Sequence, residues 1–555
     1  MSDAGGRTAA RMRAVLFLIA AAAAAAMTAA TSTGIGVSND TVQYFDCARN
    51  LSLGRGYVTS LHNYYHPLAP SDYIRRWRAD GAVDLPLRPE VQFPPLYPAL
   101  LALLNPRGGD FQGAARAMGI FLFAFNIFWT GLLVFRFTRR SCAAAVSGAI
   151  FMAAAEGMLD IHSAGYAEPL FIALSLIGLT LLSKYFEHGR LRPLLFGAAV
   201  LGLSYGAKYT GGMLIVSCSV GFLAFGPGRA ARRVRDTAVF LAAAGILPAL
   251  LMIRNLLVGG DAANRIVGLR NVVGPFLAGV GRTWTSWAAP GAARIPAAAP
   301  ASIFPLFAAA GAAAAAVLAA AAARVLRNRG RASAAAESVA EPPPPYLFLV
   351  YPPVYVLLFL AAAVGLDENL IPDGRLFAPI FPAAVIGVLY IFHRARGHWG
   401  GGRMRKAASG LAFAYLAAYA LAGLLGLKAI RDYGRGYAGE FWRRSDVAAA
   451  VELVRARPGF LIFTNDDTAI RHFAGRSVCF VPFGRFLRPD PALLADLDGV
   501  PALFVYWKSA AHARAERKYT NLGQDAIQAA AVRTLKERLL LDGPDAAVFE
   551  TPGRR

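Results

Sequence analysis

Residues 6–34, GRTAARMRAVLFLIAAAAAAAMTAATSTG, place three arginines directly before an apolar run that is long enough to cross a membrane. Arginines beside a span mark its cytoplasmic end. The stretch resembles a cleavable signal peptide, but apolar segments of similar length continue along the whole chain. We therefore interpret it as an uncleaved first span over about 14–34, with the N-terminus in the cytoplasm.

The overall composition supports a membrane protein. Of the 555 residues, 56% are hydrophobic and 16% are charged, whereas a soluble globular protein carries about 25% charged residues. The net charge of +23 could suggest a nucleic-acid partner, but much of it falls in short clusters between the apolar runs, as the positive-inside rule predicts. The sequence therefore predicts a multi-pass membrane protein with no nucleic-acid partner.

The apolar runs and basic clusters together predict about eleven spans. After the first span we expect spans near 114–136, 142–160, 168–186, 192–207, 210–226, 237–254, 302–324, 346–364, 376–393 and 407–428. With this count every basic cluster falls on the cytoplasmic side. The predicted fold class is mainly α, a polytopic bundle of transmembrane helices.

Three segments divide the chain further. Residues 35–112 form a long outer loop, and the proline-rich segment 327–345 is expected to be a cytoplasmic linker. Beyond residue 430 the runs FLIFT, SVCFVP and PALFVYW are short and β-rich, and they alternate with helical patterns. We predict a transmembrane domain over 1–430 and a small α/β domain over 431–555. An odd number of spans places the second domain outside the cytoplasm.

Ionisable and polar side chains next to the predicted spans gather on the outer side. They are Asp40 after the first span, His162 and Glu168 between the third and fourth, Lys208 between the fifth and sixth, Arg254 and Asn255 at the end of the seventh, and Arg375 before the tenth. Ionisable groups near a membrane are costly, which makes them candidates for function.

The chemistry of these groups suits a lipid-linked substrate. No nucleotide is expected outside the cytoplasm, so an activated group would arrive on a lipid carrier. The guanidinium of Arg375 can bind phosphate oxygens through two hydrogen bonds, and Lys208 could supply a second charge. Asp40 could then take a proton from an acceptor hydroxyl. Fixed positive charge would help the lipid phosphate to leave.

Each candidate also has a purely structural interpretation. A carboxylate just after a span, such as Asp40, is often a helix cap or a solvated interface residue. Lys208 and Arg254 could extend toward the lipid headgroups. Arg375 could tie its own loop together, and Glu168, which precedes a proline, could simply begin a helix.

Several segments, in this order, resemble the GT-C class of polytopic glycosyltransferases, specifically the bacterial relatives of protein O-mannosyltransferases and lipid A aminoarabinose transferases. They are SNDTVQYFDCARNLSLGRGY (38–57), FPPLYPALLAL (93–103), SAGYAEPLFIALSLIGLTLL (163–182) with GLSYGAKYTGG (202–212), and DGRLFAPIFP (373–382).

The resemblance implies a glycosyltransferase that moves a sugar from a polyprenyl-phosphate donor to an acceptor hydroxyl at the outer face of the bacterial inner membrane. It implies that Asp40 is the catalytic base of an inverting transfer and that Glu168 is a second acidic residue of the site. Lys208 and Arg375 would meet the donor phosphate. Tyr44, one turn after Asp40, would either flank an acceptor groove or pack beneath the base.

The remaining predictions concern further substrate contacts, the cofactor, the acceptor and the alternative functions. Arg254, Asn255 and His162 complete the expected substrate-binding residues. Asn39 stands where many relatives carry a second acidic residue, so a bound divalent metal is left open. The acceptor could be a glycolipid, a polysaccharide or a protein. The alternative functions are an oligosaccharide ligase or polymerase, and a lipid flippase or transporter, although the two halves of the chain show no internal repeat.

Overall fold

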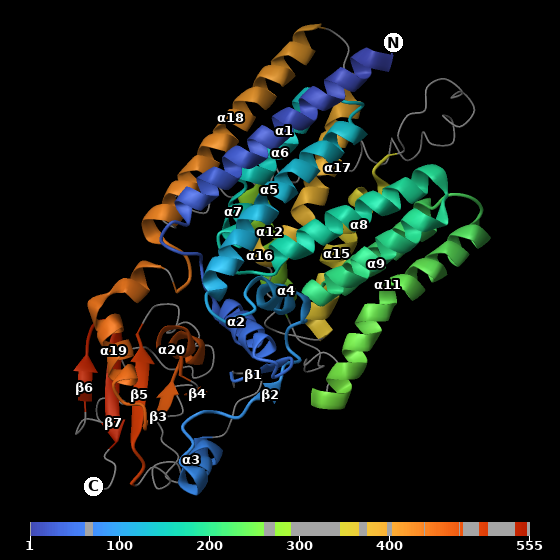
Figure 1. The fold of residues 1–555 in the computed structure, drawn as a ribbon. Helices are drawn as coiled ribbons and strands as arrows, with labels where there is room; N and C mark the ends of the chain where they lie inside the picture. Colours follow the sequence, from blue (N-terminus) through green and yellow to red (C-terminus); the bar gives the residue numbers. More distant parts are fainter. Residues whose placement is uncertain are drawn as a thin grey trace. The chain divides into compact units, whose positions relative to one another are not determined.

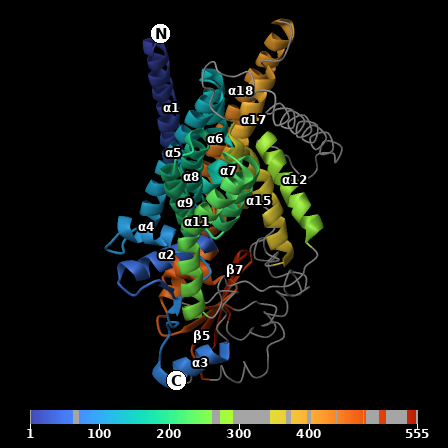
Figure 2. The ribbon, with the colours of Figure 1, turned by 90° about the vertical axis from the view of Figure 1, so that its right-hand side faces the viewer.

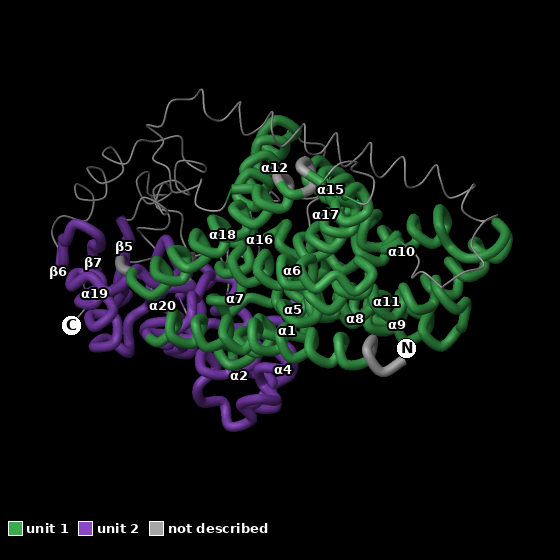
Figure 3. The backbone as a smooth tube through the Cα atoms, turned by 90° about the horizontal axis from the view of Figure 1, so that it is seen from above, with its two compact units in different colours: residues 1–32, 91–97, 115–432 green, residues 33–90, 98–114, 433–555 purple. Residues whose placement is uncertain are grey.

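The apolar runs form helices that make up most of the described chain (Figure 1). The computed structural model describes residues 2–61, 70–259, 272–289, 344–365, 374–396, 402–437, 439–476, 478–480, 499–508 and 539–551. These residues form two compact units, coloured separately in Figure 3. The membrane unit comprises residues 1–32, 91–97 and 115–432, and the sheet unit comprises residues 33–90, 98–114 and 433–555.

A set of helices belongs largely to the membrane unit, and most of them carry predicted spans. They are α1 (Ser2–Ala30), α5 (Phe111–Phe137), α6 (Cys142–Ala154), α7 (Glu156–His162), α8 (Glu168–His188), α9 (Leu191–Ala207), α10 (Gly211–Phe225), α11 (Ala230–Gly259), α12 (Val273–Ala288), α15 (Tyr346–Gly365), α16 (Gly374–Phe377), α17 (Phe381–Arg396) and α18 (Gly402–Tyr433). A 3₁₀ turn, Ala378–Ile380, joins α16 to α17.

Within the described residues, seven helical segments are long and apolar enough to cross a membrane. Helices α6 and α7 are bent by 58° at their junction and give an eighth if they count as one span. Helices α9 and α10 lie where we predicted spans near 192–207 and 210–226, but they have only 17 and 15 residues. The predicted span near 302–324 lies outside the described residues. The multi-pass helical fold is confirmed, while the described chain supports seven or eight spans rather than eleven.

One helix of the membrane unit was not expected from the sequence. Helix α12 lies between the spans predicted near 237–254 and 302–324, where we predicted no span. It contacts α7, α15 and α16, and it buries Phe276, Thr283 and Trp287, which recur at helical spacing. The packing of α12 depends on this one apolar face. An apolar pattern of this length is too short to be predicted as a membrane span.

Small residues bring α8, α9 and α11 close together. The three helices lie side by side in Figure 1 and overlap in the turned view of Figure 2. A Cβ atom on Gly178 would lie 3.4 Å from the Gly197 carbonyl oxygen, and one on Gly197 would lie 3.3 Å from the Gly178 carbonyl oxygen. On the other side of α9, a Cβ on Gly202 would lie 2.9 Å from the Ala244 carbonyl oxygen. Such close backbone approach is typical of membrane helices. It fixes α8 against α9, whose ends carry two of the candidate site residues.

The sheet unit contains the predicted C-terminal α/β structure. Its strands are β3 (Leu461–Thr464), β4 (Cys479–Phe480), β5 (Ala502–Trp507), β6 (Leu539–Asp542) and β7 (Ala546–Thr551), in the order β4-β3-β5-β7-β6. Strand β3 is parallel to β4 and β5, whereas β7 is antiparallel to β5 and β6. Helices α19 (Ser445–Arg455) and α20 (Asp467–Ala474) accompany the sheet. The predicted small C-terminal sheet is confirmed, and it is mixed.

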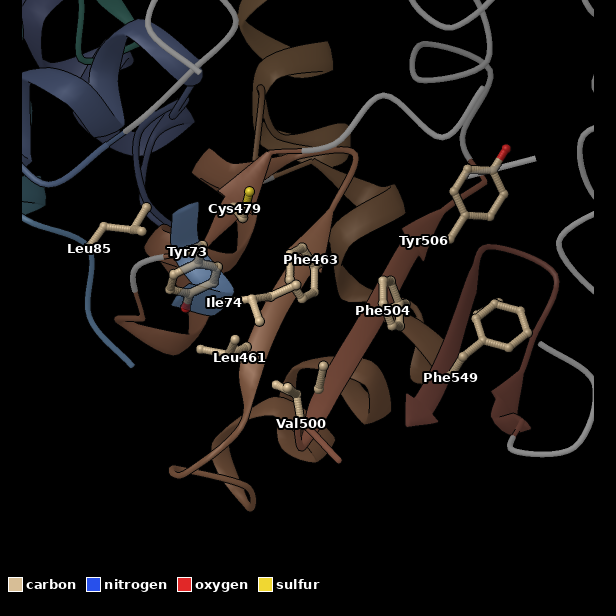
Figure 4. Packing of buried hydrophobic residues seen from close by; sticks show 12 residues of the cluster. Tyr73, Ile74, Leu85, Leu461, Phe463, Cys479, Val500, Phe504, Tyr506 and Phe549 are labelled. Atoms are coloured by element: carbon tan, nitrogen blue, oxygen red, sulfur yellow. The ribbon is translucent and has the colours of Figure 1, made fainter. Parts of the chain in front are cut away.

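The same unit takes up much of the predicted outer loop. This part of the chain contains α2 (Asn39–Ser52), β1 (Val58–Thr59), α3 (Pro70–Asp80) and β2 (Arg88–Pro89), and most of α4 (Leu96–Leu104). Tyr73, Ile74 and Leu85 pack into one hydrophobic core with strand residues such as Phe463 and Phe504 (Figure 4). The compact unit therefore differs from the predicted division at residue 430, because apolar side chains from the loop complete the core of the sheet.

Candidate active site

Glu168 begins α8 and is the centre of a charged cluster in the membrane unit. Ala167 precedes it without a capping side chain, and Pro169 follows at a position where helices tolerate proline. The Glu168 side chain is 1% exposed. Its Oε1 accepts a hydrogen bond from Lys208 Nζ and lies 3.6 Å from Arg375 Nε. The residue does begin a helix, and its carboxylate also holds two cations.

Lys208 occupies the break between α9 and α10. It has an extended backbone, and its amide donates to the Ser204 carbonyl oxygen at 3.0 Å. The turn closes tightly, because a Cβ on Gly211 would lie 2.5 Å from the Tyr205 amide nitrogen. The Lys208 side chain is 15% exposed. It binds a buried carboxylate within the protein, which is a different arrangement from a lysine that extends to the headgroups.

Arg375 lies on the single turn of α16. Its side chain is 27% exposed, and its guanidinium lies 4.9 Å from the centre of the Tyr166 ring, within cation–π range. The next residue, Leu376, accepts a hydrogen bond at its carbonyl oxygen from the buried hydroxyl of Tyr355 at 3.1 Å. Helix α15 thereby fixes the segment that presents Arg375. The acidic residues that could tie this loop, Asp373 and Glu368, lie outside the described residues.

A second chain of hydrogen bonds secures the residue next to Lys208. The Tyr209 hydroxyl donates to the Val91 carbonyl oxygen at 3.0 Å and accepts from Asn255 Nδ2 at 3.0 Å. Asn255 is buried, and its Oδ1 accepts from Arg254 Nη1 at 3.0 Å. Asn255 therefore joins the end of α11 to the Lys208 turn. Arg254 is half-exposed beside it.

His162 is bonded on both ring nitrogens. Its Nδ1 donates to the Met158 carbonyl oxygen at 2.7 Å, and its Nε2 accepts from Asn126 Nδ2 at 3.1 Å. Asn126 also donates to the Pro169 carbonyl oxygen at 3.2 Å. We predicted a substrate contact for His162, but the residue is buried and its two nitrogens serve protein partners. Through Asn126 it is connected to the first turn of α8, and its contact with a substrate stays a prediction.

Asp40 lies in the first turn of α2, in the sheet unit. The N-cap is Ser38, whose Oγ accepts from the Thr41 amide at 3.4 Å. The capping role considered for Asp40 therefore belongs to Ser38. Asp40 is half-buried, and an ionised carboxylate in a first helical turn is stabilised by the helix dipole.

Asp46, two turns further along α2, is held differently. Its carboxylate accepts from Thr59 Oγ1 at 2.9 Å, from the Ser60 amide at 2.6 Å and from Arg471 Nη2 at 2.6 Å. These donors occupy most of its lone pairs, so Asp46 is a structural carboxylate that joins α2 to β1 and α20. Tyr44 is 2% exposed, which supports packing rather than a place beside an acceptor groove.

The start of α2 is also tied to the C-terminal part of the sheet unit. The Tyr437 hydroxyl lies 2.7 Å from Asn39 Oδ1, 2.8 Å from Asp466 Oδ1 and 2.5 Å from Thr468 Oγ1. The backbones at Gly436 and Val37 also approach closely. A Cβ on Gly436 would lie 2.0 Å from the Val37 carbonyl oxygen. Residues some 400 positions apart thus set the position of the turn that carries Asp40.

The sequence analysis did not identify several of these supporting residues. Asn126, Tyr209, Tyr355 and Tyr437 all hold site segments through single hydrogen bonds or short chains of them. Only Asn126 carried a usable signal, since a lone amide within the apolar run FAFNIF is costly unless it has a partner.

The membrane-unit cluster can bind an anion. Two cations at one buried carboxylate provide positive charge and hydrogen-bond donors in a poorly solvated setting, where electrostatic interactions are strong. A metal site is not evident in the same way. Among the residues that the structure describes, no group of three or more His, Cys, Asp or Glu side chains could hold a metal ion.

Comparison with solved structures gives similar folds. The chain matches ArnT from Cupriavidus metallidurans bound to undecaprenyl phosphate with a TM-score of 0.55 and 12% identity, over 97% of each chain. The apo state of that protein also matches, with a TM-score of 0.55 and 14% identity. The Archaeoglobus fulgidus oligosaccharyltransferase in complex with Zn and sulfate matches with a TM-score of 0.55 and 11% identity, over 92% of this chain and 70% of that chain.

A further match is the archaeal oligosaccharyltransferase AglB in complex with an inhibitory peptide and a dolichol-phosphate, with a TM-score of 0.51 and 13% identity. No protein-family model and no curated protein sequence matches the chain. The predicted resemblance to GT-C membrane proteins is thereby confirmed at the level of the fold.

Proposed function

We propose that this chain, which has the fold of the GT-C membrane glycosyltransferases ArnT and AglB, is itself a glycosyltransferase. Its donor is a sugar linked to a polyprenyl phosphate, and its acceptor is a hydroxyl group at the outer face of the bacterial inner membrane. Support comes from the two similar structures that hold undecaprenyl phosphate and dolichol-phosphate, which are lipid phosphates of this class.

The proposed reaction is a single displacement. The acceptor oxygen forms a bond to the anomeric carbon of the sugar, and the bond between that carbon and the phosphate oxygen breaks. The bonding electron pair leaves with the polyprenyl phosphate, and the acceptor proton passes to a carboxylate. Attack from the face opposite the leaving group inverts the anomeric centre.

The role proposed for each residue is supported by a feature of the unit that contains the residue. Asp40 is the base, since it lies half-buried in the first turn of α2, within the segment that resembles the first outer loop of the GT-C enzymes. Lys208 and Arg375 bind the donor phosphate and stabilise the charge that develops on it. Glu168 orients both cations. The single observation that carries the proposal is this buried cluster, with two cations at one carboxylate, in a chain with a GT-C fold.

Transfer can be tested with the full chain in detergent. The purified protein is incubated with polyprenyl-phosphate-linked radiolabelled monosaccharides and an envelope fraction as the acceptor. Labelled product should form without a membrane gradient, which separates transfer from transport. Product that forms only from diphosphate-linked oligosaccharides would instead indicate an oligosaccharide ligase. This alternative is retained because two of the similar structures are oligosaccharyltransferases.

The proposed base is tested by Asp40→Asn, which should lower transfer by at least about 100-fold while expression and thermal stability stay at the wild-type level. Asp72→Asn is the matched control, because Asp72 also lies in the first turn of a helix of the same unit but is solvent-exposed. Full activity in Asp40→Asn would remove Asp40 from the mechanism.

A further inference from the structure

Glu168 reduces the positive charge that its two cations present. Its Oε1 meets both Lys208 Nζ and Arg375 Nε, and its buried Oε2 has no hydrogen-bond partner among the residues that the structure describes. A glutamate is not needed to fill this space, since glutamine has nearly the same shape. The residue that stands here subtracts one full charge from a cluster that, under the proposed function, binds phosphate.

The two lipid phosphates of the proposed reaction differ in charge. The donor is a phosphodiester and carries one negative charge. The product is a phosphomonoester, whose second ionisation lies near pH 6, by analogy with phosphorylated side chains, so it approaches two negative charges at pH 8. A strongly cationic site would therefore hold the product more tightly than the donor and slow each turnover.

We propose that Glu168 sets the charge of the cluster so that the singly charged donor is retained and the doubly charged product is released. The carboxylate repels both ligands, and the repulsion grows with ligand charge. Neutralising Glu168 should consequently tighten product binding more than donor binding. This inference rests on the proposed function and adds to it a residue that discriminates between donor and product.

Other titratable groups lie near the start of α8 and remain unchanged in the comparison. Tyr97 on α4 is buried and interacts electrostatically with Glu168. Helix α7, which contacts α8, carries Glu156, Asp160 and His162. Because these groups are present in both the wild type and a Glu168 variant, the difference between the two proteins reports the charge at position 168.

The experiment measures binding of undecaprenyl phosphate and of its methyl phosphodiester to the full chain at pH 8. In Glu168→Gln, diester binding should tighten by about tenfold and monoester binding by about the square of that factor, roughly 100-fold, because the ligand charge doubles. At pH 5 the monoester is mostly singly charged, so the two ligands should tighten alike. Glu168→Asp keeps the charge and should keep the wild-type ratio of the two affinities.

The matched control is Glu187→Gln, which removes a carboxylate paired with Arg136 at the other end of α8 and should leave both affinities unchanged. If Glu168→Gln weakens both ligands equally while the wild type binds them, Glu168 only positions the cations. The inference is then overturned and the proposed function stands. If the wild type binds neither ligand and Lys208→Met changes nothing, the phosphate-binding proposal itself fails.

Discussion

Lys208 and Glu168 form a buried ion pair. Removing one partner of such a pair lowers the stability of the protein much more than replacing both partners together. Lys208→Met keeps an unbranched side chain but leaves the buried Glu168 carboxylate without its hydrogen-bond donor. Removing one partner of a buried pair costs about 3–5 kcal/mol of folding free energy. We expect a lower midpoint of thermal unfolding in detergent together with loss of phosphate binding.

The double variant Glu168→Gln/Lys208→Met provides the control, because it removes both charges together. It should recover most of the lost stability while phosphate binding stays weak. An unfolding midpoint as low as that of Lys208→Met alone would argue that the lysine acts through packing.

His472 on α20 predicts a pH-dependent stability in the sheet unit. Burial lowers the pKa of His472 from 6.5 to about 4, and the ring stacks on Tyr437 at 5.5 Å between centres. The unfolded chain therefore takes up a proton below pH 6.5 while the folded unit does so only near pH 4. The stability contributed by neutral His472 is present above pH 6.5 and is lost as the pH falls through this window, by up to about 3 kcal/mol.

A comparison with His472→Gln isolates this effect. Unfolding of the full chain is followed by tryptophan fluorescence at pH 7.5 and at pH 4.5. The loss of stability between the two pH values should be smaller in the variant, because glutamine does not titrate. Equal losses in both proteins would show that His472 is accessible to protons in the folded state.

At the scale of elements, the packing of α9 against α11 depends on the absence of side-chain atoms. A Cβ on Gly202 would lie 2.9 Å from the Ala244 carbonyl oxygen, so the two backbones must separate to admit alanine. Overpacking of this kind costs about 1–3 kcal/mol. We expect Gly202→Ala to lower the unfolding midpoint and, since α9 ends at Lys208, also to lower phosphate affinity.

Gly245 on α11 offers a matched control. A Cβ there meets no atom of the described part of the chain within 4 Å, and alanine has the higher helix propensity. Gly245→Ala should be neutral or slightly stabilising. Destabilisation of similar size in both variants would assign the effect to a general property of these helices.

At the scale of the whole molecule, the topology remains a prediction with a direct test. Cys142 is exposed and is the first residue of α6, just after Arg139 and Arg140, at an end we assign to the cytoplasm. Glu452 is exposed on α19 of the sheet unit, which we place outside. In intact cells, a membrane-impermeant maleimide should label Glu452→Cys and should label Cys142 only after permeabilisation. The opposite pattern would reverse the topology.

The sequence alone determined the character of the chain. Apolar runs of about 20 residues with few charges can satisfy their backbone polar groups only as helices in a membrane, and this dictates a multi-pass α fold. The β-rich runs beyond residue 430 likewise gave the small sheet. Residues such as Lys208 and Glu168 stood out locally, because a charge beside a span is costly.

Tertiary structure decided which of these residues act together. The pairing of Glu168 with Lys208 and Arg375 joins positions 40 and 207 residues apart, and the contact between Tyr437 and Asn39 joins positions 398 apart. No local pattern encodes such pairs, because they depend on how closely glycine-lined helices approach and on which loop residues complete a distant core. For the same reason, only the fold shows that both ring nitrogens of His162 bond to protein partners.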